Sequence, residues 1–226
     1  MSDSAYDNRD LIMERMRHGQ HRKVIGGAWD EMGALQRDFL IAEGLLPGHR
    51  LLDVGCGALR GGVTLIPYLD PGKYWGIDKN AALLEVGWSV ELADAGLTAR
   101  QPREQLVGLP DFEFASLGVQ FDYAIAQSVF THLSLNRIRR CLARLAPCME
   151  KGARFYATFF ELEPGADRES EQLHQPGGMI SHSSSSFYHY SQRDLAFVIE
   201  DLAWELRYLG DWGHPRGQRM LLFVKR

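Results

Sequence analysis

The order of strand-like and helix-like segments limits the fold of this chain more than any other feature. Short apolar stretches typical of buried strands occur at 50–54, 73–78, 112–115, 121–126 and 153–160. Helices are predicted before the first strand at 9–20 and 34–46, and between later strands at 61–69, 81–95 and 135–147. Because strands separated by helices pair in parallel, this alternation predicts a parallel sheet with helices on both faces.

The C-terminal third departs from this alternation. Residues 161–190 are polar and rich in Gly, Ser and His, without periodicity, so we expect a loop that packs no core. A helix is expected after Ser191, which forms a capping box with Asp194. Two strand-like stretches follow, "WELRYL" and "RMLLFVK", separated by too few residues for a helical crossover. They are therefore predicted to form an antiparallel hairpin.

Composition excludes several classes of partner. The 226 residues, 45% hydrophobic and 24% charged, are typical of a soluble globular protein with a sizeable core. A net charge of −4 provides no basic stripe, so no nucleic-acid partner is expected. No apolar run approaches the ~20 residues of a membrane span, so no membrane partner is expected. Three cysteines without framework spacing indicate reduced thiols and a cytoplasmic protein.

The stretch "LLDVGCGALRGG", residues 51–62, is a predicted strand that runs into a glycine turn. Gly55 and Gly57 lack a Cβ where the chain turns and where a ligand must approach the backbone. Asp78 ends the next predicted strand, and an acid there accepts hydrogen bonds from both hydroxyls of a ribose. The turn is therefore predicted to bind a ligand with a ribose, although Asp78 as a mere helix cap is the alternative.

Two residues distinguish the candidate ligands. A dinucleotide fingerprint, G-x-G-x-x-G, needs glycine at position 60, where this chain has Arg60. Asp53 lies two residues before the first glycine, and its carboxylate would repel a pyrophosphate. It would suit a ligand with an ammonium and a sulfonium group, and S-adenosylmethionine has both. An NAD-dependent oxidoreductase and a non-catalytic S-adenosylmethionine-binding module are the alternative functions.

These motifs together resemble those of class I S-adenosylmethionine-dependent methyltransferases. "LLDVGCG" is similar to the family's first motif, "YWGIDKN" to its second, and "FDYAIAQSVFTHL" to its fourth-strand motif. The resemblance covers roughly residues 34–226 and favours a bacterial branch that modifies small molecules or sugars. It implies an α/β fold, a Rossmann-like three-layer sandwich with a seven-stranded, mostly parallel sheet and an antiparallel C-terminal hairpin. The methyltransferase domain would span 47–226 with a polar substrate loop at 161–190, after an N-terminal helical cap or lid at 1–46.

The expected function is methylation of a small-molecule or sugar-type acceptor on oxygen, with S-adenosylmethionine as cofactor; the oligomeric state is left open. Expected cofactor contacts are Asp53, Gly55, Cys56, Gly57, Asp78, Lys79, Gln127, Gly27 and Trp29. Expected acceptor contacts are Arg60, Ser128, Phe160, His182 and His214. Cys56 is read as a packing residue and not as a nucleophile. Trp29 as a plain hydrophobic anchor is the alternative to a lid residue, and Arg60 as a surface residue is the alternative to a ligand contact.

His132, shortly after the fourth predicted strand, is the candidate catalytic base. An imidazole with an ordinary pKa near ~6.5 suits proton removal from a hydroxyl at neutral pH. The alternative is that His132 packs or caps its loop. The histidines lack the short ligand spacing of a structural zinc site, so no metal is predicted. Two departures from the family pattern are Leu59, where a third glycine is common, and Ala115–Ser116, where an acid often holds the adenine.

Overall fold

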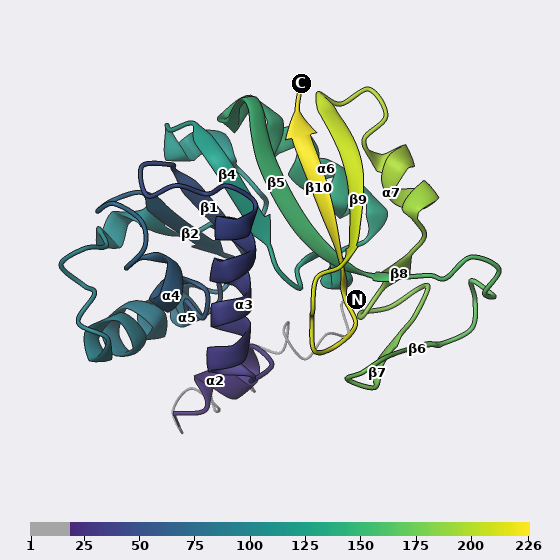
Figure 1. Cartoon of the computed structure of the whole chain (residues 1–226), viewed down its shortest axis with the longest axis horizontal. Coiled ribbons are helices and arrows are strands. Elements are labelled where there is room, and N and C mark those ends of the chain that lie inside the picture. The colour runs from purple at the N-terminus through teal and green to yellow at the C-terminus, as the bar shows by residue number, and fades with distance from the viewer. Residues whose placement is uncertain (1–18) are drawn as a thin grey trace. The chain divides into compact units, whose positions relative to one another are not determined.

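The computed structural model describes residues 19–226, in two compact units whose described parts are 19–111 and 112–226 (Figure 1). The predicted helix at 9–20 and the first part of the predicted cap segment lie almost wholly outside this range. Within it, no helix is long and apolar enough to cross a membrane. The three cysteines are buried and form no disulfide.

The first unit is built on a parallel three-stranded arrangement. Its strands are β1 (Leu51–Val54), β2 (Tyr74–Asp78) and β3 (Leu106–Gly108), and β2 pairs in parallel with the other two. Its helices are α2 (His21–Val24), α3 (Trp29–Ala42), α4 (Gly62–Leu65) and α5 (Ala81–Val86), with a π-helical continuation at Gly87–Leu92 and a 3-10 turn at Arg103–Gln105. The alternation of strands and helices predicted from the sequence is confirmed here.

The third strand was predicted at the wrong place. It lies at Leu106–Gly108, and the predicted stretch 112–115 is a turn that enters a 3-10 helix at Phe114–Leu117. Phe112 has a left-handed backbone, φ +60°, which is incompatible with a strand. Phe112 and Phe114 are both buried, with ring centroids 6.0 Å apart. The apolar alternation of "FEF" therefore marks two stacked rings and not strand pairing.

The second unit combines parallel and antiparallel pairing. Strand β4 (Phe121–Ala126) pairs in parallel with β5 (Met149–Glu161), and β10 (Arg219–Lys225) pairs antiparallel with β5 and with β9 (Trp204–Asp211). Figure 1 shows β10 in yellow between β5 and β9. The predicted C-terminal hairpin is thus confirmed. The remaining elements are a 3-10 turn at Phe130–His132, α6 (Leu135–Leu145), a 3-10 turn at Ala146–Cys148 and α7 (Gln192–Val198).

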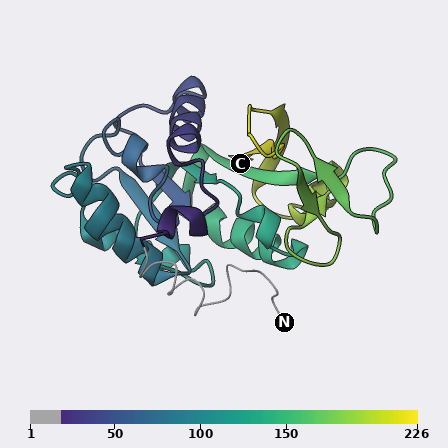
Figure 2. The ribbon, with the colours of Figure 1, turned by 90° about the horizontal axis from the view of Figure 1, so that it is seen from below.

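The polar segment at 161–190 has more structure than the sequence indicated. It contains the hairpin β6 (Gln172–His174) and β7 (Met179–Ser181), followed by β8 (His189–Tyr190). Strand β8 pairs in parallel with the end of β5, with Phe160 opposite His189. Figures 1 and 2 both show this green segment extending from the C-terminal end of β5. Polar residues without periodicity form short strands here because β5 supplies an edge for β8, while β6 and β7 pair with each other.

Aromatic side chains fill the core of the second unit. Trp204, Phe155 and Phe223 are fully buried, and their ring centroids lie 5.8–6.4 Å apart. The indole nitrogen of Trp204 donates to the carbonyl oxygen of Leu142 at 2.9 Å, which joins β9 to α6. Helix α7 begins with the predicted capping box, since the Ser191 hydroxyl accepts from the amide of Asp194 and the Asp194 carboxylate accepts from that of Ser191.

Candidate functional site

The glycine turn after β1 is held directly by the acid at the end of β2. Gly55 and Gly57 have left-handed backbones, φ 74° and 57°. The amide of Gly57 donates to Oδ2 of Asp78 at 3.0 Å, and the amide of Asn80 donates to Oδ1 at 2.7 Å. Asn80, not Asp78, is the N-cap of α5. Asp78 is therefore more than a helix cap, because its buried carboxylate fixes the turn.

Leu59 adopts a backbone conformation that is more typical of glycine. Its φ is +69°, in the left-handed region that disfavours residues with a Cβ. Its side chain is fully buried and packs against Gly87 so closely that a Cβ at Gly87 would lie 2.7 Å from Cγ of Leu59. Burial of the leucine side chain offsets the backbone cost. Leu59 therefore occupies a position whose backbone conformation favours glycine.

Asp53 is a buried carboxylate beside the turn. Its exposed fraction is 3%, and its Oδ2 accepts a hydrogen bond from the Tyr74 hydroxyl at 2.7 Å. Burial raises the pKa of Asp53 to about 6, against the opposing effects of the Tyr74 hydrogen bond and the positive charge of Arg60. A Cβ at Gly61 would lie 3.3 Å from the same oxygen and 2.5 Å from Oε1 of Gln36, so a larger residue there would displace the Gln36 side chain. A cationic ligand would stabilise this carboxylate in its ionised form.

Arg60 anchors the chain that precedes α3. Its Nη1 donates to the carbonyl oxygens of Ile25 and Gly27, at 3.2 and 2.9 Å. The guanidinium is almost completely buried, which contradicts the reading of Arg60 as a surface residue. Through these two hydrogen bonds, Arg60 attaches residues 20–28, hereafter the N-terminal strap, to the chain just after Gly55 and Gly57. The predicted contact of Arg60 with the acceptor stays a prediction.

A second anchor of the strap is Glu91, which the sequence analysis missed. Its carboxylate accepts from His21 Nε2 at 2.5 Å and from both Nε and Nη2 of Arg22 at 2.7 Å. Burial opposes ionisation, but the hydrogen bonds from Arg22 and His21 lower the pKa of Glu91. The Arg22 guanidinium also lies 4.6 Å from the centroid of Trp29. Gly27 thus belongs to a strap that is anchored by Arg60 and by Glu91, and Trp29, the first residue of α3, packs against the strap through Arg22.

In the second unit, polar side chains gather where β4 and β5 end. The amide of Ser128 donates to Oγ1 of Thr158 at 2.7 Å, and that hydroxyl donates to Oε1 of Gln218 at 2.6 Å. Gln127 lies 3.0 Å from Nε2 of His214. Ser128 has a left-handed backbone, φ +59°, at the tip of the strand. Three predicted ligand contacts, Gln127, Ser128 and His214, are therefore brought together, along with Thr158 and Gln218, which were not predicted.

Two contacts hold the ring of His214. The amide of Arg216 donates to Nδ1 of His214 at 3.0 Å, and the side-chain nitrogen of Gln127 lies 3.0 Å from Nε2. The same Gln127 nitrogen donates to the Ser128 hydroxyl at 2.5 Å, which joins His214 to the polar cluster.

His132 is half-buried and packs against the loop that follows β7. Its Nδ1 lies 2.8 Å from the Ser186 hydroxyl, and its ring centroid lies 4.8 Å from that of Phe187. The amide of Tyr188 donates to the carbonyl oxygen of Thr131 at 2.7 Å, which attaches the same loop to the 3-10 turn. These contacts agree with the alternative that His132 packs its loop, and they leave its role as a base a prediction.

Comparison with known proteins establishes the fold. No protein-family model matches the sequence. The magnesium protoporphyrin IX methyltransferase of Synechocystis PCC 6803, solved with bound S-adenosylmethionine, aligns over 98% of this chain and 93% of its own, with a TM-score of 0.64 and 16% identity. An S-adenosylmethionine-dependent methyltransferase of Clostridium acetobutylicum aligns over 94% and 98%, with a TM-score of 0.63 and 12% identity. The chain has the S-adenosylmethionine-dependent methyltransferase fold.

A third similar structure with this methyltransferase fold is also known. It is CalS10 of Micromonospora echinaspora, an amino pentose methyltransferase, which aligns over 95% of this chain and 97% of its own, with a TM-score of 0.59 and 17% identity. The α/β class, the mostly parallel sheet and the antiparallel C-terminal strands predicted from the sequence are confirmed. The individual contacts to cofactor and acceptor stay predictions.

The remaining predicted residues lie at different depths around the methyltransferase fold. Lys79 is exposed next to Asp78, whereas Cys56 is buried, and burial raises the pKa of its thiol well above the ordinary value. Phe160 is fully buried. His182 is half-buried, with Nδ1 3.5 Å from a carboxylate oxygen of Glu171. Among residues 19–226, no three His, Cys, Asp or Glu side chains are grouped so as to hold a metal ion.

A pocket of about 480 Å³ lies where the polar segment leaves β5. Glu161, Arg168 and Gln192 are among the residues that line it. Gln192 donates to Glu161 at 2.7 Å and Arg168 pairs with Asp194 at 2.9 Å, so these polar groups satisfy one another. None of the predicted acceptor contacts lines this pocket, and we do not assign it to the acceptor.

Proposed function

We propose that the chain is an S-adenosylmethionine-dependent methyltransferase that methylates a hydroxyl group of a small-molecule or sugar-type acceptor. The observation that carries the proposal is the pairing of two buried acids around one glycine turn. Asp78 ends β2 and holds the amide of Gly57, while Asp53 lies buried in β1 with a raised pKa. A ribose and a cation are the two ligand groups that such carboxylates attract.

The residues of the chain fit the proposed cofactor. The buried carboxylate of Asp78 lies at the end of β2 and binds the amides of Gly57 and Asn80, and it would also accept hydrogen bonds from the ribose hydroxyls. Asp53 would attract the positive charges of the cofactor, and the N-terminal strap would exclude water from it. The cofactor supplies an electrophilic methyl group on a sulfonium. These residues would align that group and keep its surroundings dry.

For a hydroxyl acceptor, His132 would take the proton. As the new oxygen–methyl bond forms and the sulfur–methyl bond breaks, the hydroxyl proton would pass to the imidazole ring of His132. The half-buried position of His132 beside Phe187 supports this role, because the ring is held in place and partly accessible. The sugar-methylating relative of the same fold supports a small polar acceptor.

Two measurements test the proposal. Calorimetry should show binding of S-adenosylmethionine and of S-adenosylhomocysteine but not of NAD. Transfer of tritium from methyl-labelled S-adenosylmethionine to monosaccharides, nucleotide sugars or phenols should then identify the acceptor. Binding of NAD in place of S-adenosylmethionine would establish the oxidoreductase alternative. Binding of S-adenosylmethionine without transfer to any acceptor would favour the non-catalytic binding module, and a product methylated on nitrogen would refute the choice of oxygen.

Affinity for S-adenosylmethionine is expected to fall at low pH, because the Asp53 carboxylate becomes protonated. The pKa of its carboxyl in the free protein is about 6, so at pH 5 roughly nine-tenths of the molecules lack the negative charge. The dissociation constant measured by calorimetry should rise about tenfold between pH 7.5 and pH 5. Asp53→Asn is the matched control, since its weaker affinity should show no such rise. A wild-type affinity as constant as that of the variant would exclude a role for Asp53.

A further inference from the structure

His174 is a half-buried imidazole that the proposed mechanism does not use. It lies at the end of β6, in the polar segment that folds against β5. Its Nε2 is 2.6 Å from the hydroxyl of Ser181, and that hydroxyl is 3.0 Å from Nδ1 of His189. Nε2 of His189 is in turn 3.0 Å from the carbonyl oxygen of Arg168. Ser181 and His189, in the middle of this hydrogen-bonded chain, are almost completely buried, whereas Arg168 is exposed and His174 is half-buried. The end at Arg168 is hereafter the inner end and the end at His174 the outer end.

The inner end of the chain determines where each hydrogen lies. The carbonyl oxygen of Arg168 can only accept, so Nε2 of His189 must carry a hydrogen and Nδ1 of a neutral ring must accept. The Ser181 hydroxyl therefore donates to His189 and accepts from His174. His174 then has its hydrogen on Nε2, and its Nδ1 is left with a lone pair. No residue from 19 to 226 donates a hydrogen bond to this Nδ1.

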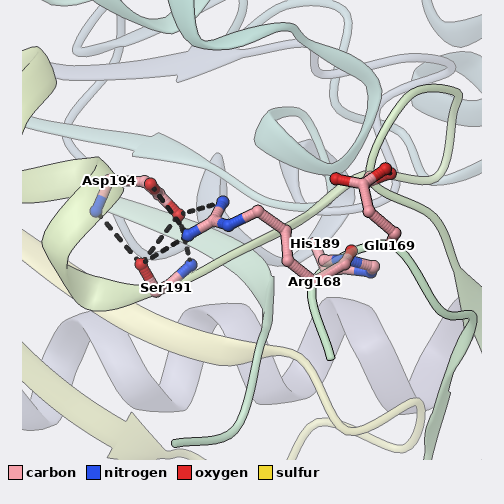
Figure 3. Close-up of polar contacts among 6 residues, drawn as sticks. Arg168, Glu169, His189, Ser191 and Asp194 are labelled. Atoms are coloured by element: carbon pink, nitrogen blue, oxygen red, sulfur yellow. Dashed lines mark hydrogen bonds and ion pairs between the residues drawn. The ribbon is translucent and has the colours of Figure 1, made fainter. Parts of the chain in front are cut away.

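The inner end is itself fixed in place. Figure 3 shows the side chain of Arg168 extended toward Asp194 and Ser191, with His189 beside its backbone. Nη1 and Nη2 of Arg168 donate to the two carboxylate oxygens of Asp194 at 2.9 and 3.2 Å. Asp194 belongs to the capping box of α7, so the carbonyl of Arg168 is tied to a helix terminus. Because this carbonyl stays in place, His189 keeps its hydrogen on Nε2. Through the Ser181 hydroxyl, His174 then keeps a single tautomer as well.

The outer end of the chain lies in the neighbourhood of His132. The ring of His174 stacks on the buried Phe160, with centroids 4.4 Å apart. Phe160 contacts Phe187 edge-on at 6.1 Å, and Phe187 contacts His132 at 4.8 Å. Two half-buried imidazoles therefore flank the Phe160–Phe187 pair. Phe187, His132 and His174 are all half-buried, so this part of the second unit presents one phenylalanine and two histidine side chains that are partly accessible.

The chemistry of His174 favours recognition over proton removal. Burial, followed by the charges of His189 and Arg219, lowers the pKa of His174 to about 4. Such a ring is neutral near pH 7 and is too weak a base for efficient proton transfer at that pH. Its Nδ1 is nevertheless a good hydrogen-bond acceptor. A site built to accept a hydrogen bond discriminates strongly against ligands that lack the donor.

We propose that His174 is a specificity-determining residue of the acceptor site, whose Nδ1 accepts a hydrogen bond from a hydroxyl group of a ring-shaped acceptor. This hydroxyl is not the one that is methylated, and Ser181 and His189 are positioning residues that hold the His174 tautomer. The inference rests on the proposed function, because it assumes an acceptor with hydroxyl groups. The shared chemistry is a ring with an apolar face and at least two hydroxyl groups, which sugars and phenols both provide.

Nitrogen-15 NMR of histidine-labelled protein with S-adenosylhomocysteine tests the proposal directly. The spectra should show His174 and His189 with their hydrogens on Nε2. Addition of methyl glucoside or catechol should move the Nδ1 signal of His174 upfield, as expected for a nitrogen that begins to accept a hydrogen bond. The responding compound tells whether the source is a sugar or a phenol. Tetrahydropyran and benzene, the matched rings without hydroxyls, should leave the signal unmoved. A hydrogen on Nδ1 of His174 overturns the inference, and so does an Nδ1 signal that neither methyl glucoside nor catechol moves.

Two substitutions of His174 distinguish the role of Nδ1 from that of Nε2. In His174→Asn the side-chain oxygen takes the place of Nδ1, whereas His174→Gln keeps only a group in the place of Nε2. Affinity for the responding diol, measured by calorimetry, should fall at least about tenfold in His174→Gln and less than about threefold in His174→Asn. Equal losses in both variants would refute the role of Nδ1. Ser181→Ala should mix the two tautomers of His174 in the NMR spectrum, which loss of packing alone would not do.

Unchanged affinity for S-adenosylhomocysteine in these variants shows that they are folded. The two proposals also fail separately. Wild-type protein that binds no S-adenosylmethionine would refute the proposed function. Wild-type protein that binds S-adenosylmethionine, but whose His174 signal ignores both diols, would refute only the inference about His174.

Discussion

Asp78→Ala is expected to weaken binding of S-adenosylmethionine about 100-fold. The carboxylate of Asp78 would accept two hydrogen bonds from the ribose, and hydrogen bonds to a charged group contribute about 1.5 kcal/mol each at the low end. Together they amount to about 3 kcal/mol, which is roughly a factor of 100 in the dissociation constant. Asp78→Asn should lose about tenfold, because its amide keeps one accepting oxygen. Calorimetry on the two variants and the wild type measures both effects.

The loss must be assigned to the ribose and not to the turn. Asp78 also accepts from the amides of Gly57 and Asn80, so its removal loosens the glycine turn as well. A cofactor analogue without the 2′-hydroxyl resolves this. Wild type should bind the analogue about tenfold more weakly than S-adenosylhomocysteine, whereas Asp78→Ala should bind both equally. Glu104→Gln, an exposed acid in the same unit, is the control and should change nothing. If removal of the 2′-hydroxyl weakened binding to the wild type and to Asp78→Ala by the same factor, the proposed ribose contact would be contradicted.

Trp204→Ala is expected to lower the free energy of unfolding by about 3–5 kcal/mol. Trp204 is fully buried against Phe155 and Phe223, so truncation removes apolar contacts and leaves a cavity. It also leaves the carbonyl oxygen of Leu142 without its indole donor. Trp204→Phe should cost less, about 1–3 kcal/mol, because the ring volume is mostly kept and the lost hydrogen bond dominates. Urea denaturation followed by circular dichroism measures both values.

Phe197 provides the matched control for this effect. It is an aromatic residue of the same unit, on α7, and its side chain is 68% exposed. Phe197→Ala should change the free energy of unfolding by no more than about 0.5 kcal/mol. If Trp204→Ala were as mild as Phe197→Ala, the aromatic core described for the second unit would be wrong.

Local patterns determined most of the fold. The alternation of strands and helices, the capping box of Ser191 and Asp194, and the short connection before the last strand each reflect interactions between residues close in sequence. The misplaced strand shows the limit of such patterns. "FEF" has the alternation of a strand, but Phe112 adopts a left-handed backbone so that its ring can stack on that of Phe114. Packing between rings overrode the local preference.

The residues of the candidate site also fall into two groups, those predicted from local sequence patterns and those found only in the structure. Asp53, the glycines and Asp78 were predicted because a nucleoside site needs them at fixed distances along the chain. Glu91, Thr158 and Gln218 were missed because their partners lie 30 or more residues away in sequence. Arg60 was noticed for breaking a dinucleotide motif, yet only the structure shows that it holds the N-terminal strap. A hydrogen bond between distant residues leaves no periodic signal in the sequence.

The sequence by itself predicted the class of fold and the ligand of the glycine turn, since both predictions depend on the order and spacing of neighbouring residues. The tertiary structure alone decided what the polar segment does. Residues 161–190 have no periodicity, but β8 pairs with the edge of β5, β6 pairs with β7, and Arg168, His189 and Ser181 orient His174. The direction of a hydrogen bond depends on which donors and acceptors meet in space, and only the folded chain brings those groups together.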